Sequence, residues 1–366
     1  MKFTCNKEVL LKEISIAQEI ISSKNAILIL SNIYLEVKDN ILIIKAKDMK
    51  VNFQTEVPVT VIEPGATTVY GDKFFGVIST FPYDELEFSQ KDNLAIIKPT
   101  TQKKPEYKLK SIASDKFPEL PASSEPFFEM PIKDFRDMIQ QSVFAVSDDE
   151  TRYFMNGVYL EKSEDKIIMV ATDGRRMAYI SKSANEKIKD FPGVIIPPKI
   201  LNTVLKRSGD EGPVNISIND KMIFINFASY KFSSLLIEGM FPNYKKVIPE
   251  SQEFYLSIKR EEMLDALRRV SLMVEKKSHR IYLGIHPGKM AIYSEESELG
   301  IVEDEIPCEY DGEEVTIALN YRYLEEPFKI MTDDVIKIRF NSAIKAITIE
   351  PIPEKDFFHI VMPMQS

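Results

Sequence analysis

Residues 38–46 read KDNILIIKA, a polar turn followed by a run of branched apolar residues. Asp and Asn tolerate the positive φ of a tight hairpin turn, and branched apolar side chains favour a strand. The stretch is therefore predicted to be the turn and second strand of a β-hairpin. The same pattern recurs at five later places: KDNLAIIKP (91–99), EDKIIMVAT (164–172), NDKMIFINF (219–227), PGKMAIYSE (287–295) and NSAIKAITIE (341–350).

The spacing of these six copies predicts the domain organisation. Their starts are separated by 53, 73, 55, 68 and 54 residues, so short and long intervals alternate. Every second copy lies 122 to 128 residues further on, close to one third of the 366-residue chain. A repeat of this kind indicates tandem units. We expect three similar domains, each built of two similar halves.

Each half is expected to contain a strand, a helix and three further strands, because segments with apolar residues spaced three and four apart precede the hairpins. The fold class is thus α+β, with similar domains at 1–122, 126–247 and 252–366, separated by linkers rich in Pro and Ser. The lack of an N–H on Pro327 predicts that the last helix is shorter than the other five. The predicted helices are 7–20, 72–80, 132–146, 197–208, 259–277 and 321–331.

Composition is that of an ordered globular protein in a reducing compartment. Hydrophobic residues make up 44% and charged residues 28%, and the net charge of −9 gives no general attraction to nucleic acid. Cys5 and Cys308 form neither a CxxC motif nor a disulfide framework. The N-terminus lacks a signal-peptide pattern and no run of about 18 apolar residues occurs. We therefore expect a cytoplasmic protein that does not span a membrane.

No catalytic, cofactor or metal motif stands out. The segment GIHPGK (284–289) is one residue short of a phosphate-binding loop, and the GxGxxG, GxSxG and HExxH motifs are absent. The three histidines fall on different predicted strands or turns. The adjacent Asp148 and Asp149 have no third ligand at a spacing that suits a metal ion. We predict no intrinsic catalysis, no cofactor and no bound metal.

Five blocks resemble, in order and spacing, the β sliding clamp family of bacterial DNA polymerase III, and the likeness covers the entire chain. The blocks are PGATTVYGDKFF (64–75), RYFMNGVYLE (152–161), ATDGRRMAY (171–179), EGMFPNYKKVIP (238–249) and IVMPMQS (360–366). The resemblance implies three tandem DNA-clamp domains and a homodimer closed head to tail around double-stranded DNA. It also implies a processivity factor in DNA replication, an accessory subunit of the DNA-directed DNA polymerase, which is itself a nucleotidyltransferase. The implied partners are the replicative polymerase α subunit, the clamp loader and other proteins carrying a clamp-binding motif.

In such a ring the helices line the hole, so their charge can be compared with that of the rest of the chain. The six predicted helical stretches carry a net +4 and the remainder −13. Weak, non-specific attraction between such helices and phosphates permits sliding. The loop before Tyr153 is Asp148-Asp149-Glu150, whose acidity disfavours a phosphate contact. The candidate DNA-facing residues are Lys12, Lys24, Lys73, Lys133, Arg136, Tyr153, Lys199, Lys206, Arg207, Arg268 and Arg269.

The resemblance further implies a groove between the second and third domains that receives short apolar peptides ending in Leu-Phe. A trough rich in Met with a few polar residues at its rim suits such a ligand. Its lining would be Met155, Thr172, Gly174, Arg175, Arg176, Met177, Pro242, Lys246, Val247, Ile344, Ala346, Ile360, Met362, Pro363 and Met364.

The dimer contact implied by the resemblance joins the first domain of one chain to the third domain of the other. Lys73 would lie near the acidic segment ESEL (295–298) of the partner. Apolar side chains ringed by charge are expected of a stable interface that can open. Its apolar residues would be Val77, Phe81, Tyr107, Leu109, Leu272 and Met273.

Two other classes of protein remain open from the residues alone. The repeats also fit a non-enzymatic β-rich scaffold that binds other proteins, although the chain lacks a signal peptide and disulfides. A hydrolase using Asp173 or Asp148 is opposed by the absence of partner residues for catalysis. A turn is a sufficient structural explanation for Asp173-Gly174.

Overall fold

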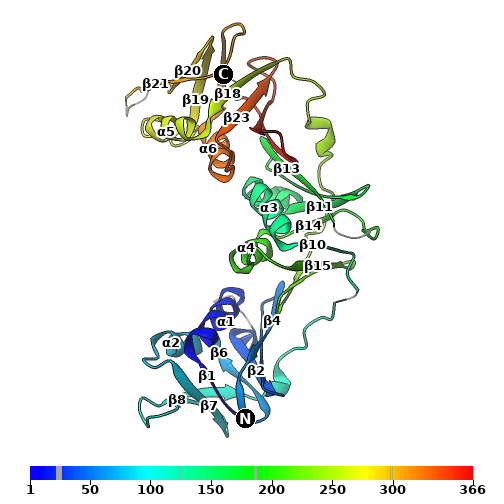
Figure 1. The fold of residues 1–366 in the computed structure, drawn as a ribbon, viewed down its shortest axis with the longest axis vertical. Coiled ribbons are helices and arrows are strands. Elements are labelled where there is room, and N and C mark those ends of the chain that lie inside the picture. The colour runs from blue at the N-terminus through cyan, green and yellow to red at the C-terminus, as the bar shows by residue number, and fades with distance from the viewer. Residues whose placement is uncertain (22–26, 124, 185–187, 297, 299, 366) are drawn as a thin grey trace. The chain divides into compact units, whose positions relative to one another are not determined.

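The computed structural model describes residues 1–21, 27–123, 125–184, 188–296, 298 and 300–365. The sequence-predicted DNA-facing residue Lys24 lies outside these residues. The described chain divides into two compact units, Met1–Ile132 with Lys206–Leu236, and Lys133–Leu205 with Ile237–Ser366. Figure 1 shows α1 and α2 side by side in the first of these units.

Six α-helices occur in the described residues, one for each predicted half-domain. They are α1 (Lys7–Ile20), α2 (Gly71–Thr80), α3 (Ile132–Ser142), α4 (Pro198–Arg207), α5 (Arg260–Val270) and α6 (Tyr321–Ile330). Each follows a short strand directly, and α1 and α6 begin at an Asn whose side-chain oxygen accepts backbone N–H groups of the first turn. The predicted helices are therefore confirmed in number and place.

Strands follow each helix in threes, as the repeat predicts. In the first domain the strands are β1 (Lys2–Asn6), β2 (Asn32–Lys38), β3 (Ile41–Lys47), β4 (Val51–Pro58), β5 (Thr60–Glu63), β6 (Gly65–Tyr70), β7 (Glu85–Lys91), β8 (Leu94–Pro99) and β9 (Tyr107–Ile112). In the second they are β10 (Phe128–Pro131), β11 (Val158–Ser163), β12 (Lys166–Thr172), β13 (Arg176–Ser183), β14 (Val194–Ile196), β15 (Pro213–Ile218), β16 (Met222–Phe227) and β17 (Tyr230–Leu235). In the third they are β18 (Phe254–Lys259), β19 (Arg280–His286), β20 (Lys289–Tyr293), β21 (Glu303–Pro307), β22 (Val315–Asn320), β23 (Val335–Phe340), β24 (Ile347–Ile352) and β25 (Phe357–Val361).

The first strand of every half is exchanged with the other half of the same domain. Strand β1 pairs with β7 while β6 pairs with β2, β10 pairs with β15 while β14 pairs with β11, and β18 pairs with β23 while β22 pairs with β19. This exchange ties the two halves of a domain together by backbone hydrogen bonds. No sequence pattern singled it out, because strands of either half have the same apolar alternation.

Two sheets continue from one domain into the next. Strand β4 of the first domain pairs with β17 of the second, and β13 of the second pairs with β25 of the third. In both junctions the last strand of a first half meets the last strand of a second half. All pairings between named strands are antiparallel, so each junction is a continuous antiparallel sheet.

The helices cover one face of these sheets and create the core. Alternate residues of β3 (Leu42, Ile44 and Ala46) are fully buried where α1 packs on β3 and β4. Helix α1 contributes Leu10, Ile14 and further apolar residues at three- and four-residue spacing to the same core. The opposite face of β3 carries Ile43, Lys45 and Lys47, as expected of a strand with one covered face.

The turn chemistry that predicted the hairpins is seen at several of the six places. Asp39, Asn40, Asp92, Glu164 and Gly288 all have positive φ. The turn before β16 is built differently, since Asn219 Oδ1 accepts hydrogen bonds from the N–H groups of residues 221 and 222 at 3.1 and 2.8 Å. These hydrogen bonds from the backbone to a side-chain oxygen close the turn without a residue of positive φ.

Three predictions about element ends were wrong. Helix α5 ends at Val270, not 277, because the N–H of Ser271 closes the helix on Leu267 O and the chain turns there. Helix α3 ends at Ser142 and continues only as the 3₁₀ turn Val143–Ala145. Strand β24 begins at Ile347, because a turn closed by Lys345 N on Ser342 O occupies the preceding residues.

The prediction that Pro327 shortens the last helix was also wrong. Helix α6 runs through Pro327 and has 10 residues, as many as α2 and α4. Pro327 is buried between Leu324 and Phe328, which are also buried, so packing offsets the one backbone hydrogen bond that proline cannot donate. The carbonyl of Pro327 still accepts the N–H of Met331 at 3.0 Å.

No helix of the described residues is long and apolar enough to cross a membrane. Both cysteines, Cys5 and Cys308, are buried and unpaired.

His359 gives the fold of the second unit a pH dependence that can be measured. The ring is buried, its Nε2 lies 3.1 Å from Gln141 Oε1, and burial, with Arg176 nearby, lowers its pKa from 6.5 to about 3. The folded protein therefore keeps His359 neutral while the unfolded chain takes up a proton below the ordinary pKa. Stability is lost as the pH falls through this interval.

We predict that the free energy of unfolding of the wild type falls by about 1.4 kcal/mol more per pH unit than that of His359→Gln between about pH 6 and pH 4. Urea unfolding at a series of pH values measures both slopes. Gln keeps a hydrogen-bonding group beside Gln141 but cannot titrate, so parallel curves for the two proteins would contradict the buried neutral histidine.

Candidate functional site

The junction of β13 with β25 brings several of the predicted peptide-pocket residues together. Met177 pairs with Ile360 across the two strands, and both are buried in one apolar cluster. Phe241 and Tyr244, from the segment after β17, cover this cluster, and Ala346 packs against it. Burial and a 2.6 Å hydrogen bond to Glu161 raise the pKa of Tyr244, so its hydroxyl stays protonated and holds the segment in place.

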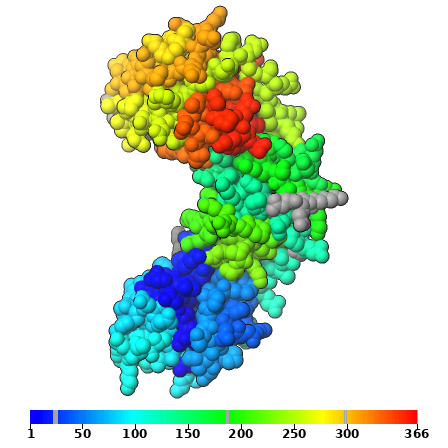
Figure 2. All heavy atoms as spheres, viewed as in Figure 1, coloured from blue at the N-terminus to red at the C-terminus, as the bar shows by residue number. Residues whose placement is uncertain are grey.

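A cavity of about 310 Å³ opens beside this cluster. The C-terminal segment forms one wall, since Met362 N–H donates to Arg175 O and Met364 N–H donates to Ala318 O, both at 2.8 Å. Met362 is 42% exposed, and the red C-terminal segment reaches the visible surface in Figure 2. The cavity is lined by Arg175, Asn320, Tyr323, Met362, Pro363, Met364 and Gln365.

The sequence missed Asn320 and Tyr323 as lining residues. They stand at the end of β22 and the start of α6, more than 100 residues from Arg175 in the chain. Their residue types carry no distinguishing pattern. Only the pairing of β25 with β13 brings the end of the chain and the second domain to one place.

The remaining predicted pocket residues are not among those that line the cavity or form the cluster, and their exposure differs widely. Val247 and Ile344 are 51% and 80% exposed, and Lys246 is exposed, whereas Met155 is buried and Pro242 half-buried. Thr172 Oγ1 donates to Arg176 O at 2.6 Å and accepts from Gly174 N at 3.0 Å. Gly174 has a φ of +88°, which a side chain would strain, so this turn requires glycine.

Arg176 is the structural centre of the site: its side chain contacts several neighbouring residues and offers little surface to a ligand. Its side chain is only 11% exposed and forms ion pairs with Asp173 and with Glu326 of α6. Its Nη2 donates to Phe144 O at 2.9 Å, and its guanidinium lies 4.7 Å from the centre of the Tyr323 ring. Arg176 thereby fixes the position of Tyr323, which lines the cavity.

Both carboxylate oxygens of Asp173 are occupied by hydrogen bonds. Its Oδ1 accepts the N–H groups of Arg175 and Arg176, and its Oδ2 accepts from Arg176 Nε at 3.1 Å. An acid whose oxygens are held in this way has no free oxygen facing a cleft to act as a base. The loop residue Asp149 is similarly occupied, by Thr151 and by Arg152 at 2.9 Å. Asp148, the other residue predicted for a hydrolase, is exposed and belongs to no metal-binding group of acids, His and Cys among the described residues. The geometry therefore gives no support to hydrolysis by Asp173 or Asp148.

Of the candidate DNA-facing residues that the structure describes, the lysines and arginines lie on helices α1 to α5, and Tyr153 lies in the 3₁₀ turn Glu150–Met155. Several are held by acids: Arg207 contacts Glu19 at 2.8 Å and Lys206 contacts the same carboxylate at 3.9 Å. The Lys206 pair is exposed and therefore weak, so it leaves the ammonium group available to phosphates. Lys12, Lys73, Lys133, Lys199, Lys206, Arg268 and Arg269 are exposed, and Arg136 and Arg207 are half-buried.

The excess positive charge on the helices is smaller than predicted. With the observed ends the six helices carry a net +2 in place of +4. The difference arises at α5, because Lys259, Glu275, Lys276 and Lys277 fall outside it. Helix α4 alone supplies +3.

The predicted dimer residues also differ in exposure. Leu272 is 72% and Met273 36% exposed in the turn after α5, while Val77, Tyr107 and Leu109 are half-buried. Phe81 is 1% exposed and lies behind Tyr107, with ring centres 6.3 Å apart. Phe81 therefore supports the position of Tyr107 and is itself covered.

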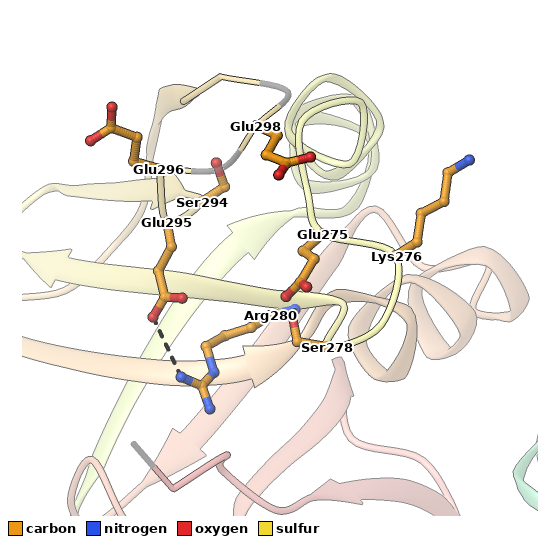
Figure 3. Close-up of a pocket in the computed structure, with 8 residues that line it drawn as sticks. All are labelled: Glu275, Lys276, Ser278, Arg280, Ser294, Glu295, Glu296 and Glu298. Carbon is orange, nitrogen blue, oxygen red and sulfur yellow. Dashed lines mark hydrogen bonds and ion pairs between the residues drawn. The ribbon is translucent and has the colours of Figure 1, made fainter.

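Figure 3 shows an acidic cavity of about 750 Å³ in the third domain. Arg280 contacts Glu295 at 3.4 Å, and Glu275, Glu296 and Glu298 have no ion pair among the described residues. In Figure 3 the carboxylates of Glu275 and Glu298 stand on the side of the cavity away from Arg280's guanidinium. The described residues contain no group of acids, His or Cys close enough to hold a metal ion.

Comparisons with known proteins decide the family. Models of the DNA polymerase III beta subunit match residues 1–121 (N-terminal domain), 129–243 (central domain) and 245–365 (C-terminal domain). The chain belongs to the DNA polymerase III beta subunit family. The beta sliding clamp of Treponema pallidum is 44% identical over 371 residues, with both chains fully covered.

Solved structures agree with this assignment. A sliding clamp from Bartonella birtlesii, crystallised with griselimycin, is 25% identical, with full coverage of both chains and a TM-score of 0.94. The Bacillus subtilis clamp shares the fold, with 24% identity, coverage of 100% and 99%, and a TM-score of 0.93. The fold is therefore three tandem clamp domains, and the function is that of a sliding clamp, a processivity factor and accessory subunit of DNA polymerase III.

We predict that Arg176→Met lowers the free energy of unfolding by about 3 kcal/mol, because it leaves the carboxylates of Asp173 and Glu326 without their buried partner. Arg175→Met removes the same charge from an exposed side chain next to it and is expected to cost less than about 0.5 kcal/mol. Urea unfolding measures both values. Equal stability of the two variants would show that Arg176 is not the structural centre of the site.

Proposed function

We propose that two copies of the chain close head to tail into a ring around double-stranded DNA. The observation that carries this proposal is the pairing of last strands. At both junctions within the chain, the last strand of a first half pairs with the last strand of the following domain's second half. Two such strands remain, β21 in the third domain and most of β9 in the first, and β21 is the edge of its sheet. Pairing β21 with β9 of a second copy repeats the same junction.

The charges of the two strands favour this pairing. Strand β21 reads EDEIP and exposes Glu303 and Glu305, whereas β9 reads YKLKSI and exposes Lys108 and Lys110. Opposite charges across paired strands stabilise the pair. Two β21 strands, each carrying acidic residues, would instead repel one another. An exposed strand edge also needs a partner or protection against aggregation.

Apolar residues beside the strands supply the rest of the proposed contact. Leu272 and Met273 of one copy would pack against Tyr107 and Leu109 of the other, with Val77 near them and Phe81 behind. The acidic cavity of Figure 3, near residues 295–298, offers carboxylates to Lys73 of the second copy. Lys73 has only a 3.4 Å contact with its neighbour Asp72, an exposed pair of small value.

The proposed ring holds DNA by topology, with weak attraction from the helices. Helix α4 carries Lys199, Lys206 and Arg207, and α5 carries Arg268 and Arg269. A small positive charge on exposed helices within a chain of −9 attracts phosphates without fixing a position. Lys12, Lys73, Lys133, Arg136 and Tyr153 would add further weak contacts.

We further propose that the junction of β13 with β25 binds short apolar peptides ending in Leu-Phe. The 310 Å³ cavity beside the buried apolar cluster offers a place for an apolar side chain, with Met362 and Met364 able to repack around it. Partners that present such peptides would be the replicative polymerase α subunit, the clamp loader and other proteins with a clamp-binding motif. Several partners sharing one site would take turns on the ring.

The remaining proposals concern chemistry, domains and location. The chain acts without catalysis or a cofactor of its own, serving the polymerase, which is the nucleotidyltransferase. Its domains are 1–122, 126–247 and 252–366, with boundaries in the linkers. A cytoplasmic location, where thiols stay reduced, suits its two unpaired cysteines.

The ring predicts a specific behaviour on circular DNA. After loading by the clamp loader, the wild type should stay on a DNA circle in high salt and be lost when one restriction cut linearises the circle. Leu272→Glu should not be retained on either form, because a charge in the apolar contact opens the dimer. Gel filtration of protein–DNA complexes before and after cutting measures retention.

Ile62→Glu is the matched control, since it places the same charge at a similarly exposed apolar residue of β5, away from the proposed contact. It should behave as the wild type. Equal retention of the wild type on circular and linear DNA would mean surface binding and would end the ring proposal.

The peptide site predicts that Met362→Glu weakens binding of a peptide ending in Leu-Phe by about tenfold or more, because a carboxylate replaces an apolar wall. The dimer should be unaffected. Met49→Glu, at another exposed methionine in the first domain, should bind as the wild type. Fluorescence anisotropy measures the affinity, and unchanged binding by Met362→Glu would remove this residue from the site.

A further inference from the structure

The junction of β4 with β17 has a second groove, on the sheet face opposite α1. Helix α1 covers the face of Leu42, Ile44 and Ala46, so Lys45 and Lys47 of β3 point to the other side. The strand registers place two rows of side chains on that side. The rows are Lys45, Gln54, Lys231 and Asn226, and Lys47, Asn52, Ser233 and Phe224.

The linker after the first domain forms the other wall. Leu120, Pro121, Ala122 and Ser123 line a cavity of about 430 Å³ together with Asn52, Gln54, Phe224, Asn226, Lys231 and Ser233. No hydrogen bond joins the backbone of residues 119–123 to another described residue. We call this space the Lys231 groove. Its linker wall offers free peptide N–H and C=O groups, and Pro121 keeps that wall extended.

The polar side chains in the groove have capacity for further hydrogen bonds. Asn52 Nδ2 donates to Ser233 Oγ at 3.0 Å. Gln54 and Asn226 make no side-chain hydrogen bond to another described residue. Carboxamides carry both donors and acceptors and therefore match the alternating N–H and C=O groups of an extended peptide.

Three lysines give this face its charge. Lys45 lies over the Tyr34 ring at 4.8 Å, and neither Lys45 nor Lys47 has a carboxylate at ion-pair distance among the described residues. Lys231 contacts Glu56 at 3.3 Å, but both side chains are well exposed, so the pair is weak. The two rows that border the groove therefore contain three ammonium groups, of which Lys231 lines the cavity, and the next row of the same face carries Glu36 and Glu56.

We propose that the Lys231 groove binds an extended acidic peptide of a partner protein. Peptide main-chain groups would bond to the linker backbone and to Gln54 and Asn226, and carboxylate side chains would meet the lysines. The occupant differs from that proposed at β13 and β25, where the same geometry presents Met177, Ile360 and aromatic rings. The groove would give the chain a second kind of docking site, independent of the ring and of the apolar pocket.

The test uses the full chain and a short fluorescein-labelled peptide of alternating Glu and Val. Fluorescence anisotropy at low salt should show saturable binding that an unlabelled peptide ending in Leu-Phe does not displace. Reversing two charges, Lys47→Glu with Lys231→Glu, should weaken binding by about tenfold or more. The control, Lys221→Glu with Lys277→Glu, changes the net charge equally at exposed lysines outside the groove and should leave the affinity unchanged.

Three results would overturn the proposal. The first is equal binding by the two double variants, which would mean attraction to net charge alone. The second is the lack of saturable binding up to about 1 mM peptide, which would mean a binding free energy weaker than about 4 kcal/mol. The third is tighter binding of an oligothymidylate of equal charge, lost in the same variant, which would assign the groove to nucleic acid.

Discussion

Backbone hydrogen bonding at the edges of the half-domain sheets is the constraint on which the rest of this structure depends. Each half forms a small sheet whose last strand would present unpaired N–H and C=O groups to water or to another chain. Joining β4 to β17 and β13 to β25 satisfies these groups and links the domains at the same time. The exchange of first strands does the same within each domain. Domain connection and strand pairing are thus one interaction, and two last strands, β21 and most of β9, take no part in such a junction within the chain.

The two junctions share this backbone geometry but have different surfaces. At β13 and β25, the face covered by the following linker carries Met177, Ile360 and aromatic side chains, and the linker itself adds Phe241 and Tyr244. At β4 and β17, the corresponding face carries amides and lysines, and the linker leaves a cavity. Duplication thus supplied one architecture twice, while substitution of outward-facing residues made one face apolar and the other basic. Strand residues that point away from the helices can change in this way because they contribute little to the core.

Many charged side chains in this protein hold neighbouring residues in position through ion pairs. The guanidinium of Arg176 contacts Asp173, Glu326, Phe144 and Tyr323, and so holds the second and third domains in register where β13 meets β25. Several helix cations likewise contact nearby acids. A helix charge of only +2 is consistent with weak attraction to DNA, which suits movement along a duplex better than a strongly basic surface would.

The sequence by itself determined the number of domains, their two-fold internal repeat, the place of every helix and the family. These properties are local or periodic: a turn residue tolerates positive φ, and apolar spacing shows which face is covered. It misjudged the ends of α3 and α5, the start of β24 and the effect of Pro327, because packing and turn hydrogen bonds outweigh local propensity there. Only the tertiary structure decided which strands pair, that Tyr323 and Asn320 line the cavity, and that Arg176 is buried. The reason is that strands with the same alternation can pair in many ways, and the choice among them follows from covering apolar faces and satisfying edges across more than 100 residues of chain.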